Sequence, residues 1–101
     1  MANVFKNEKG QGSETGSVLY TVPSQTIAIL IGLNLANITN SQKTASVTIG
    51  STHIIKDAPI PAGSALSALD GKIILEEGEE IEVTSSEDSS IDVIISLLEQ
   101  S

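Results

Sequence analysis

The sequence predicts an all-β fold, a single antiparallel β-sandwich of about seven or eight strands that is jelly-roll-like. Short segments in which apolar side chains alternate with polar ones recur along the chain, and polar turns separate them. With 101 residues, the chain is long enough for one domain with one core. Phe5 and Tyr20 are its only aromatic residues, so the core must be built from Ile, Leu, Val and Ala, whose β-branched members fit a pleated sheet.

The most apolar segment, residues 26–37 (TIAILIGLNLAN), is predicted to form the central strand. Its odd-numbered positions are large aliphatic residues, which an extended strand places on one face: Ile27, Ile29, Ile31, Leu33 and Leu35. We expect this row to form the centre of the core. Its expected partners on other strands are Val47, Ile49, Ile73, Leu75, Ile81, Val83, Val93 and Ile95. The substitution Ile31→Asp is then expected to abolish folding, because it would bury an unpaired charge.

Residues 1–16 are expected to be a flexible N-terminal arm, which leaves residues 17–101 as the β-sandwich domain. Phe5 and the preceding valine are the sizeable apolar side chains of this segment, so it cannot offset its ordering entropy alone. Two alternatives stay open. The arm is a disordered tail, or it becomes ordered by docking on a neighbouring subunit through Phe5, Lys6 and Lys9.

The first half of the domain shows further strand signals. Residues 17–22 alternate and are followed by proline, which predicts a first strand. Residues 44–49 and 53–56 flank a Gly-Ser-Thr turn and are predicted to form a hairpin. Residues 57–64 contain two prolines, so they either cross between sheets or run along an edge. Residues 65–69 fit a half-turn of helix or a short strand.

The second half contains two more predicted turns and a terminal strand. Asp70-Gly71 is a strong turn signal. Beyond it, residues 72–75 and 80–84 flank the Glu-rich turn 76–79 and are predicted to pair as a second hairpin. Residues 91–98 alternate like a strand but also match helical spacing. Four β-branched residues among the first five favour a strand.

The composition excludes several classes of partner. Thirteen acidic residues against five lysines give a net charge of −8, whereas nucleic-acid binding through phosphates needs clustered Lys and Arg. No run approaches the roughly 20 apolar residues of a membrane span. The absence of cysteine excludes disulfides and thiolate sites. We therefore expect no nucleic-acid and no membrane partner.

No residue pattern points to catalysis, so we expect a non-enzyme with no catalytic, cofactor-binding or metal-binding residues. His53 is the only histidine, and metal or triad chemistry needs partners around it. No serine lies in a GxSxG or SxxK motif. The Glu-rich turn 76–79 and the strand after it crowd carboxylates together. A calcium site there is weighed against a solvated acidic face, and both alternatives stay open.

Several short sequence motifs occur in combination along the chain. They are YTVP at residues 20–23, LAN at 35–37, KDAPIPAG at 56–63, LEEGE at 75–79 and SLLE at 96–99. In this combination the chain resembles a family of small virion structural proteins of tailed bacteriophages, mostly phages of marine bacteria. The resemblance covers nearly the whole chain, but its motifs are structural and bring no catalytic residues or cofactors.

The resemblance implies a virion protein that is made in the cytoplasm of an infected bacterial host. The function we expect is that of a capsid decoration or cement protein, bound in many copies to the outside of the head. Its partners would be the major capsid protein or other virion proteins. One alternative is a tail, neck or fibre-base component. Another is a degenerate cupin-like module that binds a sugar or metal, because cupins contain similar turns. Cupin metal sites need several histidines, and this chain has one.

An interface is expected from the apolar residues that remain after the core row is assigned. These residues, together with those of the arm, are Phe5, Lys6, Lys9, Leu19, Leu30, Ile74, Ile94 and Leu98. Burying them between subunits would stabilise a homo-oligomer, with a trimer favoured. The alternative is that the second sheet of the same sandwich covers them.

Overall fold

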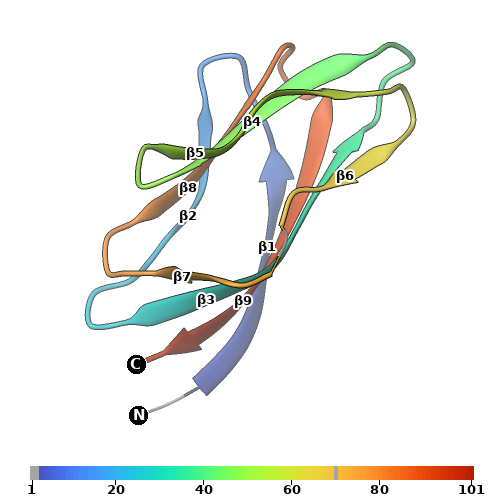
Figure 1. Ribbon diagram of the computed structural model, residues 1–101. Coiled ribbons are helices and arrows are strands. Elements are labelled where there is room, and N and C mark those ends of the chain that lie inside the picture. Colours follow the sequence, from blue (N-terminus) through green and yellow to red (C-terminus); the bar gives the residue numbers. More distant parts are fainter. Residues whose placement is uncertain (1–2, 70) are drawn as a thin grey trace.

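The computed structural model describes residues 3–69 and 71–101, and these form nine β-strands and no helix (Figure 1). The strands are β1 (Asn3–Gln11), β2 (Ser17–Thr21), β3 (Ile27–Asn37), β4 (Lys43–Ile49), β5 (Thr52–Ile60), β6 (Ala65–Ser67), β7 (Ile73–Leu75), β8 (Glu80–Ser85) and β9 (Ile91–Gln100). In the described part of the chain, no helix is long and apolar enough to cross a membrane. The predicted all-β sandwich is confirmed.

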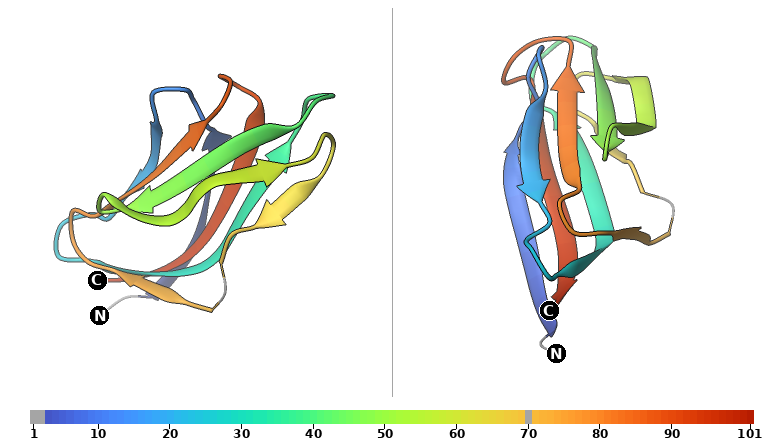
Figure 2. Two further views of the ribbon diagram at one scale, coloured as in Figure 1. Left: turned by 45° about the horizontal axis from the view of Figure 1, so that its top comes forward. Right: turned by 90° about the vertical axis from the view of Figure 1, so that its left-hand side faces the viewer.

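The strands form two antiparallel sheets that face each other, as both views in Figure 2 show. Sheet A has the order β1-β9-β3-β6, and β7 also pairs with β3. Sheet B has the order β2-β8-β4-β5. The chain starts and ends in neighbouring strands, because Asn3 pairs with Gln100.

The pairing pattern is that of a jelly roll. Strands β1 and β9, β2 and β8, β3 and β7, and β4 and β5 are antiparallel partners, so the chain is one long hairpin closed at the β4–β5 turn. This hairpin is rolled up, which brings β9 beside β3 and β8 beside β4. Successive strand pairs of the rolled hairpin lie alternately in sheet A and sheet B, which is how a double-sheet jelly roll is built.

The core lies between the two sheets and is almost entirely aliphatic. Its largest fully buried apolar side chains are Val22, Leu30, Leu35, Val47, Ile60, Leu75, Ile81, Val83, Ile91, Ile95 and Leu97. Most of the predicted core residues outside the central strand are buried, and Ile73 is partly buried. Leu33 and Leu35 of the central strand are buried as predicted.

The predicted core row is wrong for its first three members, because β3 contains a bulge. The register with β9 shifts between Leu30 and Gly32, so Ile31 is an extra residue without a partner. Ahead of the bulge the even positions therefore face the core, and Ala28 and Leu30 are fully buried. Ile27, Ile29 and Ile31 face outward instead. Ile31 is 41% exposed, so the expectation that Ile31→Asp abolishes folding no longer follows.

The structure describes residues 3–16 of the expected flexible arm, and residues 3–11 of them form a strand. This strand, β1, pairs with β9 along its whole length and forms one edge of sheet A. Leu19 of β2 lies against Gly10, where an added Cβ would come within 2.6 Å of the leucine Cδ2 atom. This contact joins the edges of the two sheets. Residues 1 and 2 of the expected arm lie outside the described residues.

The other expected elements are partly confirmed. The β4–β5 hairpin is present, and β9 is a strand. Residues 57–60 of the proline-containing segment form the end of the edge strand β5, and residues 61–64 cross to β6 in sheet A, so both expected alternatives occur. The hairpin expected from β7 and β8 is wrong, because β7 pairs with β3 in sheet A and β8 lies in sheet B. The predicted Asp70-Gly71 turn includes Asp70, which lies outside the described residues.

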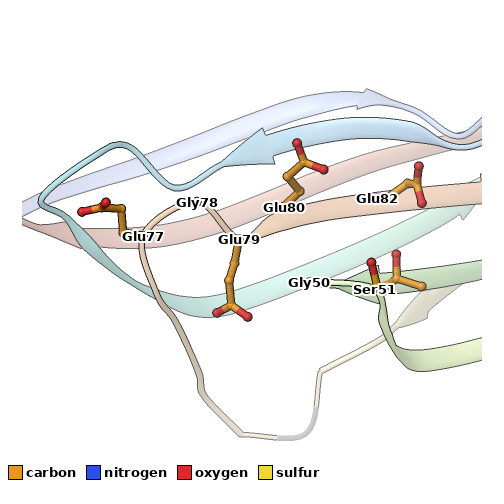
Figure 3. A pocket seen from close by; sticks show the side chains of 8 residues that line it. Gly50, Ser51, Glu77, Gly78, Glu79, Glu80 and Glu82 are labelled. Atoms are coloured by element: carbon orange, nitrogen blue, oxygen red, sulfur yellow. The ribbon is translucent and has the colours of Figure 1, made fainter.

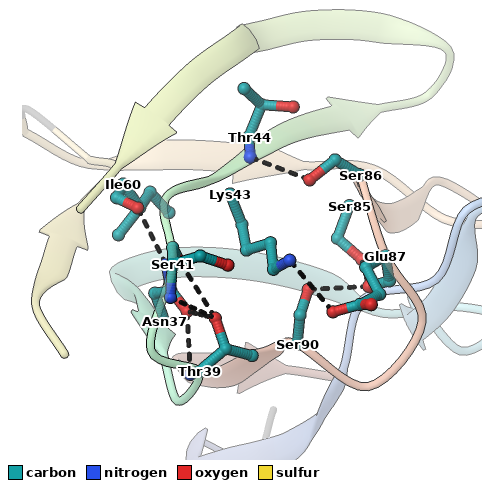
Figure 4. A network of polar contacts seen from close by, with 10 residues as sticks. All are labelled: Asn37, Thr39, Ser41, Lys43, Thr44, Ile60, Ser85, Ser86, Glu87 and Ser90. Carbon is teal, nitrogen blue, oxygen red and sulfur yellow. Dashed lines mark hydrogen bonds and ion pairs between the residues drawn. The ribbon is translucent and has the colours of Figure 1, made fainter. Parts of the chain in front are cut away.

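A network of polar contacts closes one end of the sandwich (Figure 4). The buried Asn37 side chain donates hydrogen bonds to the carbonyl oxygens of Ser41 at 2.8 Å and Ile60 at 2.9 Å. Its Oδ1 atom accepts from the backbone N–H of Thr39 at 2.9 Å and from the Thr39 hydroxyl at 2.7 Å. The amide thereby ties the end of β3 to the following loop and to β5. A buried amide satisfied in this way favours one conformation of the loop.

Candidate docking surface

Four apolar side chains lie side by side across the outer face of sheet A. Phe5 pairs with Leu98, Leu98 pairs with Ile29, and Ile29 pairs with Ile74. Directly paired residues of antiparallel strands point to the same face. The neighbours Leu30, Leu75 and Leu97 point into the core, so this set points away from it. We call the set the apolar row.

The apolar row is accessible over much of its length. Phe5 is 77% exposed and Ile74 is 67% exposed, whereas Ile29 and Leu98 in the middle are half-buried by their neighbours. Ile27, Ile31 and Ile94 are exposed on the same sheet and widen the row along β3 and β9. Large exposed apolar patches on a small domain mark sites of contact with another protein or a ligand.

The outer face of sheet A carries almost no charge. Its outward positions on β1 and β9 hold amide and hydroxyl side chains at Asn3, Asn7, Gln11, Ser96 and Gln100. Lys9 and Asp92 are the charged residues at these outward positions, and their charges cancel. The rest of the −8 net charge therefore lies elsewhere on the molecule.

The structure brings together about half of the interface residues expected from the sequence. Phe5, Ile74 and Leu98 belong to the apolar row, and Ile94 and Lys9 lie on the same face. Ile29 is a central member that the sequence analysis missed, because the bulge in β3 could not be located from the alternation of side chains.

Three expected interface residues lie elsewhere. Leu30 is fully buried in the core, so its assignment to an exposed second face is wrong. Leu19 packs between the edges of the two sheets, against Gly10. Lys6 points to the other side of β1, where its Nζ atom lies 5.9 Å from the centre of the Tyr20 ring.

A small charged cluster surrounds Tyr20 at the edge of the sandwich where β1 and β2 approach each other. The Tyr20 hydroxyl donates a hydrogen bond to the Glu99 carboxylate. The Lys6 Nζ atom lies 3.8 Å from Glu99 Oε2 and 3.4 Å from Glu8 Oε2. Burial of the phenol raises the pKa of Tyr20 well above its usual range, and the hydrogen bond to Glu99 and the charges of Glu99 and Glu8 add to the shift. The cluster joins β1, β2 and β9 and requires a protonated tyrosine.

An acidic cleft of about 450 Å³ lies at the rim, between the β4–β5 turn and the β7–β8 turn (Figure 3). Glu77, Glu79, Glu80 and Glu82 line it, but their carboxylates point in different directions. Two of them are engaged locally. Glu77 Oε1 accepts from the Gln25 N–H at 2.5 Å, and Glu79 Oε1 accepts from the Glu76 N–H at 2.8 Å.

This arrangement gives the calcium alternative no support. Among the residues that the structure describes, no three His, Asp or Glu side chains are placed where they could hold a metal ion together. His53 lies exposed on the edge strand β5, paired with Thr48 rather than with another titratable residue. What the geometry offers is a surface for contact, and the apolar row is its most prominent part.

A comparison with models of known protein families and with curated proteins found no match for this chain.

Proposed function

We propose that this chain is a non-enzymatic structural protein of a tailed-bacteriophage virion, and that it decorates the outside of the assembled head in many copies. The observation that carries the proposal is the exposed apolar row on an almost uncharged face of an otherwise acidic molecule. Such a face is used for contact with other proteins in an assembly. Its partners are the major capsid protein or other virion proteins, and further copies of itself.

Two further observations support an assembly component. The space between the sheets is filled by aliphatic side chains, so the jelly roll presents its outer surfaces to partners. The motifs that carry the resemblance to small phage structural proteins lie on β2, β3, β5, the β7–β8 turn and β9, which are parts of both sheets. Acidic side chains over the rest of the molecule oppose contacts between copies through those other surfaces.

A tail, neck or fibre-base component is the second candidate, because the same apolar row would serve it equally well. The cupin-like module is less well supported. The cleft in this chain is acidic and lies at the rim, and the single histidine lies outside its lining.

The test is the copy number and position of the chain in purified virions. Quantitative mass spectrometry against the major capsid protein, with a cryo-electron microscopy map of the same particles, measures both. Copies in a fixed ratio to the capsid protein on the head surface are expected. A few copies confined to the tail would replace the decoration function by the tail function, and absence of the chain from virions would exclude both.

A further inference from the structure

We propose that two copies of this chain pair face to face through the outer surfaces of their A sheets, with the apolar row of each copy at the centre. The inference deepens the proposed function and rests on it only for the place where the pairs act, which is the virion. It names the partner of the apolar row as a second copy, related by a two-fold axis, in place of the trimer expected from the sequence.

The area of the face fits such a pair. Strands β1, β9 and β3 of sheet A are about ten residues long, and the short strands β6 and β7 both lie beside β3; with strands about 4.8 Å apart and about 3.3 Å per residue, the face covers roughly 600 Å² in projection. Accessible surface exceeds projected area because side chains stand up from the sheet. A stable interface of standard size buries about 800 Å² on each partner. A pair that buries the whole face on each copy therefore approaches the standard size of a stable interface.

The distribution of charge favours a second copy as the occupant. Two molecules that each carry a net charge of −8 repel one another through most of their surfaces. On the outer face of sheet A, the charges of Lys9 and Asp92 cancel, so this face can approach its own copy without net charge repulsion. Within the Glu-rich segment 76–82, Glu80 and Glu82 lie on β8 in the opposite sheet, whereas Glu76 directly follows β7 of sheet A.

The shape of the row favours two-fold symmetry. Two sheet faces can stack with their strands aligned, about 10 Å apart and with interdigitating side chains, and two copies of the same face can do so about a two-fold axis. Ile74 and Phe5 stand at the two ends of the row and are its most exposed members. In a two-fold interface every contact occurs twice, so Phe5 and Ile74 of each copy would both contact the other copy.

The experiment measures the mass of the full-length protein by sedimentation over a wide range of concentrations. The test variants are Ile74→Asp and Phe5→Asp, at exposed positions where folding does not depend on the side chain. The control variants are Val18→Asp, on β2 of the opposite sheet and 47% exposed, and Ile38→Asp, in the loop after β3 and 53% exposed. Circular dichroism and thermal melting of each variant at low concentration verify that it folds.

We expect a mass of two copies for the wild type and for both controls. Each test variant should weaken pairing by about a hundredfold or more, because every pair would then bury two unpaired carboxylates. A wild type that stays monomeric at all concentrations, a mass of three copies, or controls that dissociate as readily as the test variants would each overturn the proposal.

Binding of the same proteins to phage heads that lack the chain separates this inference from the proposed function. Monomeric wild type that binds heads, with binding lost in Ile74→Asp, would mean that the apolar row faces the shell. The inference would then fail and the proposed function would stand. If the chain pairs in solution but is absent from virions, the inference would stand and the proposed function would fail.

Discussion

Leu30 and Ile31 are adjacent in the sequence but lie in different environments. Leu30 is fully buried between the sheets, and Ile31, the extra residue of the β3 bulge, is 41% exposed on the outer face. The bulge therefore decides which side chain stabilises the fold. No composition rule would separate these two neighbours, because both are large and aliphatic.

We expect Leu30→Ala to lower the free energy of unfolding by about 2–5 kcal/mol, because it leaves a cavity in a close-packed core. The matched variant Ile31→Ala should lower it by less than about 1 kcal/mol, since its side chain already contacts solvent. Denaturant unfolding followed by circular dichroism measures both. Equal losses, or a larger loss at Ile31, would contradict the placement of the bulge, which buries Leu30 and exposes Ile31.

Tyr20 gives the molecule a stability limit at alkaline pH. Its pKa is raised in the folded state, chiefly by burial and then by the hydrogen bond to Glu99, so the folded protein binds the phenolic proton more tightly than the unfolded chain does. The stabilisation is fully present below the ordinary tyrosine pKa of about 10. Above it the unfolded chain loses its proton first, and the free energy of unfolding falls as the pH rises.

The absorbance of tyrosinate measures this directly, because the chain has one tyrosine and no tryptophan. Tyr20 should titrate above about 10, or only when the protein unfolds. Glu99→Gln retains an acceptor for the hydroxyl and removes the charge, so the pKa should move toward its usual value. Titration of the wild type at the ordinary value would mean that the Tyr20 cluster does not form.

Strand β1 shows how an element can form without an apolar pattern. Its residues that face the sandwich are Val4, Lys6, Glu8 and Gly10, which show no hydrophobic alternation. The strand is held by its backbone ladder with β9 and by the contacts of Lys6 with Glu99 and Tyr20. Tertiary pairing of this kind leaves no local signal, so the sequence predicted a flexible arm.

Amide hydrogen exchange tests β1 as an element. In an edge strand of an antiparallel sheet, alternate N–H groups bond to the one neighbour and the others face solvent. We therefore expect alternate amides of residues 3–11 to exchange slowly, as in the edge strand β5 of the opposite sheet. Fast exchange of every amide in this range, with protection retained in β9, would mean that the segment is flexible in solution.

The misassigned hairpin of β7 and β8 has a different cause. Ile73, Leu75, Ile81 and Val83 alternate in phase, which satisfies two neighbouring strands of one sheet. The same alternation also satisfies two strands that face each other across the core, which is the arrangement the structure has. Periodicity fixes which side of a strand is buried, but it does not fix the sheet to which the strand belongs.

At the scale of the molecule, the sandwich class, the central strand and the β4–β5 hairpin were predictable because each depends on local periodicity and turn residues. The candidate surface was predictable only in part. Phe5, Ile74 and Leu98 were identified as apolar residues without a place in the core. Ile29 completes their row only through the register of β3 with β9 and β7, and register depends on the bulge.

The rolled-hairpin topology also brings the two ends of the chain together. Residues at opposite ends of the sequence pair in β1 and β9. This ladder is one of the longest in the fold, and its formation closes the largest loop of the chain. Pairings between distant segments slow folding, because the entropy of loop closure is lost before the contacts form. A change of connectivity that makes this ladder local should therefore raise the folding rate without altering the core.

A circular permutant tests this consequence. A short Gly-Ser linker joins Ser101 to Asn3, and the chain is opened between Ala62 and Gly63, both exposed in the β5–β6 turn. The ladders of β9 with β1 and β3, and that of β2 with β8, become closer in sequence, whereas those of β3 with β6 and β7 and of β4 with β8 become more distant. The balance favours faster folding.

We expect the permutant to keep the fold and to refold roughly three- to tenfold faster in stopped-flow experiments. The control is the unpermuted chain with the same linker appended to its end, which should refold at the wild-type rate. A permutant that folds no faster would mean that formation of the β1–β9 ladder does not limit the rate. A permutant that fails to fold, although the control folds, would contradict the placement of the two ends in neighbouring strands.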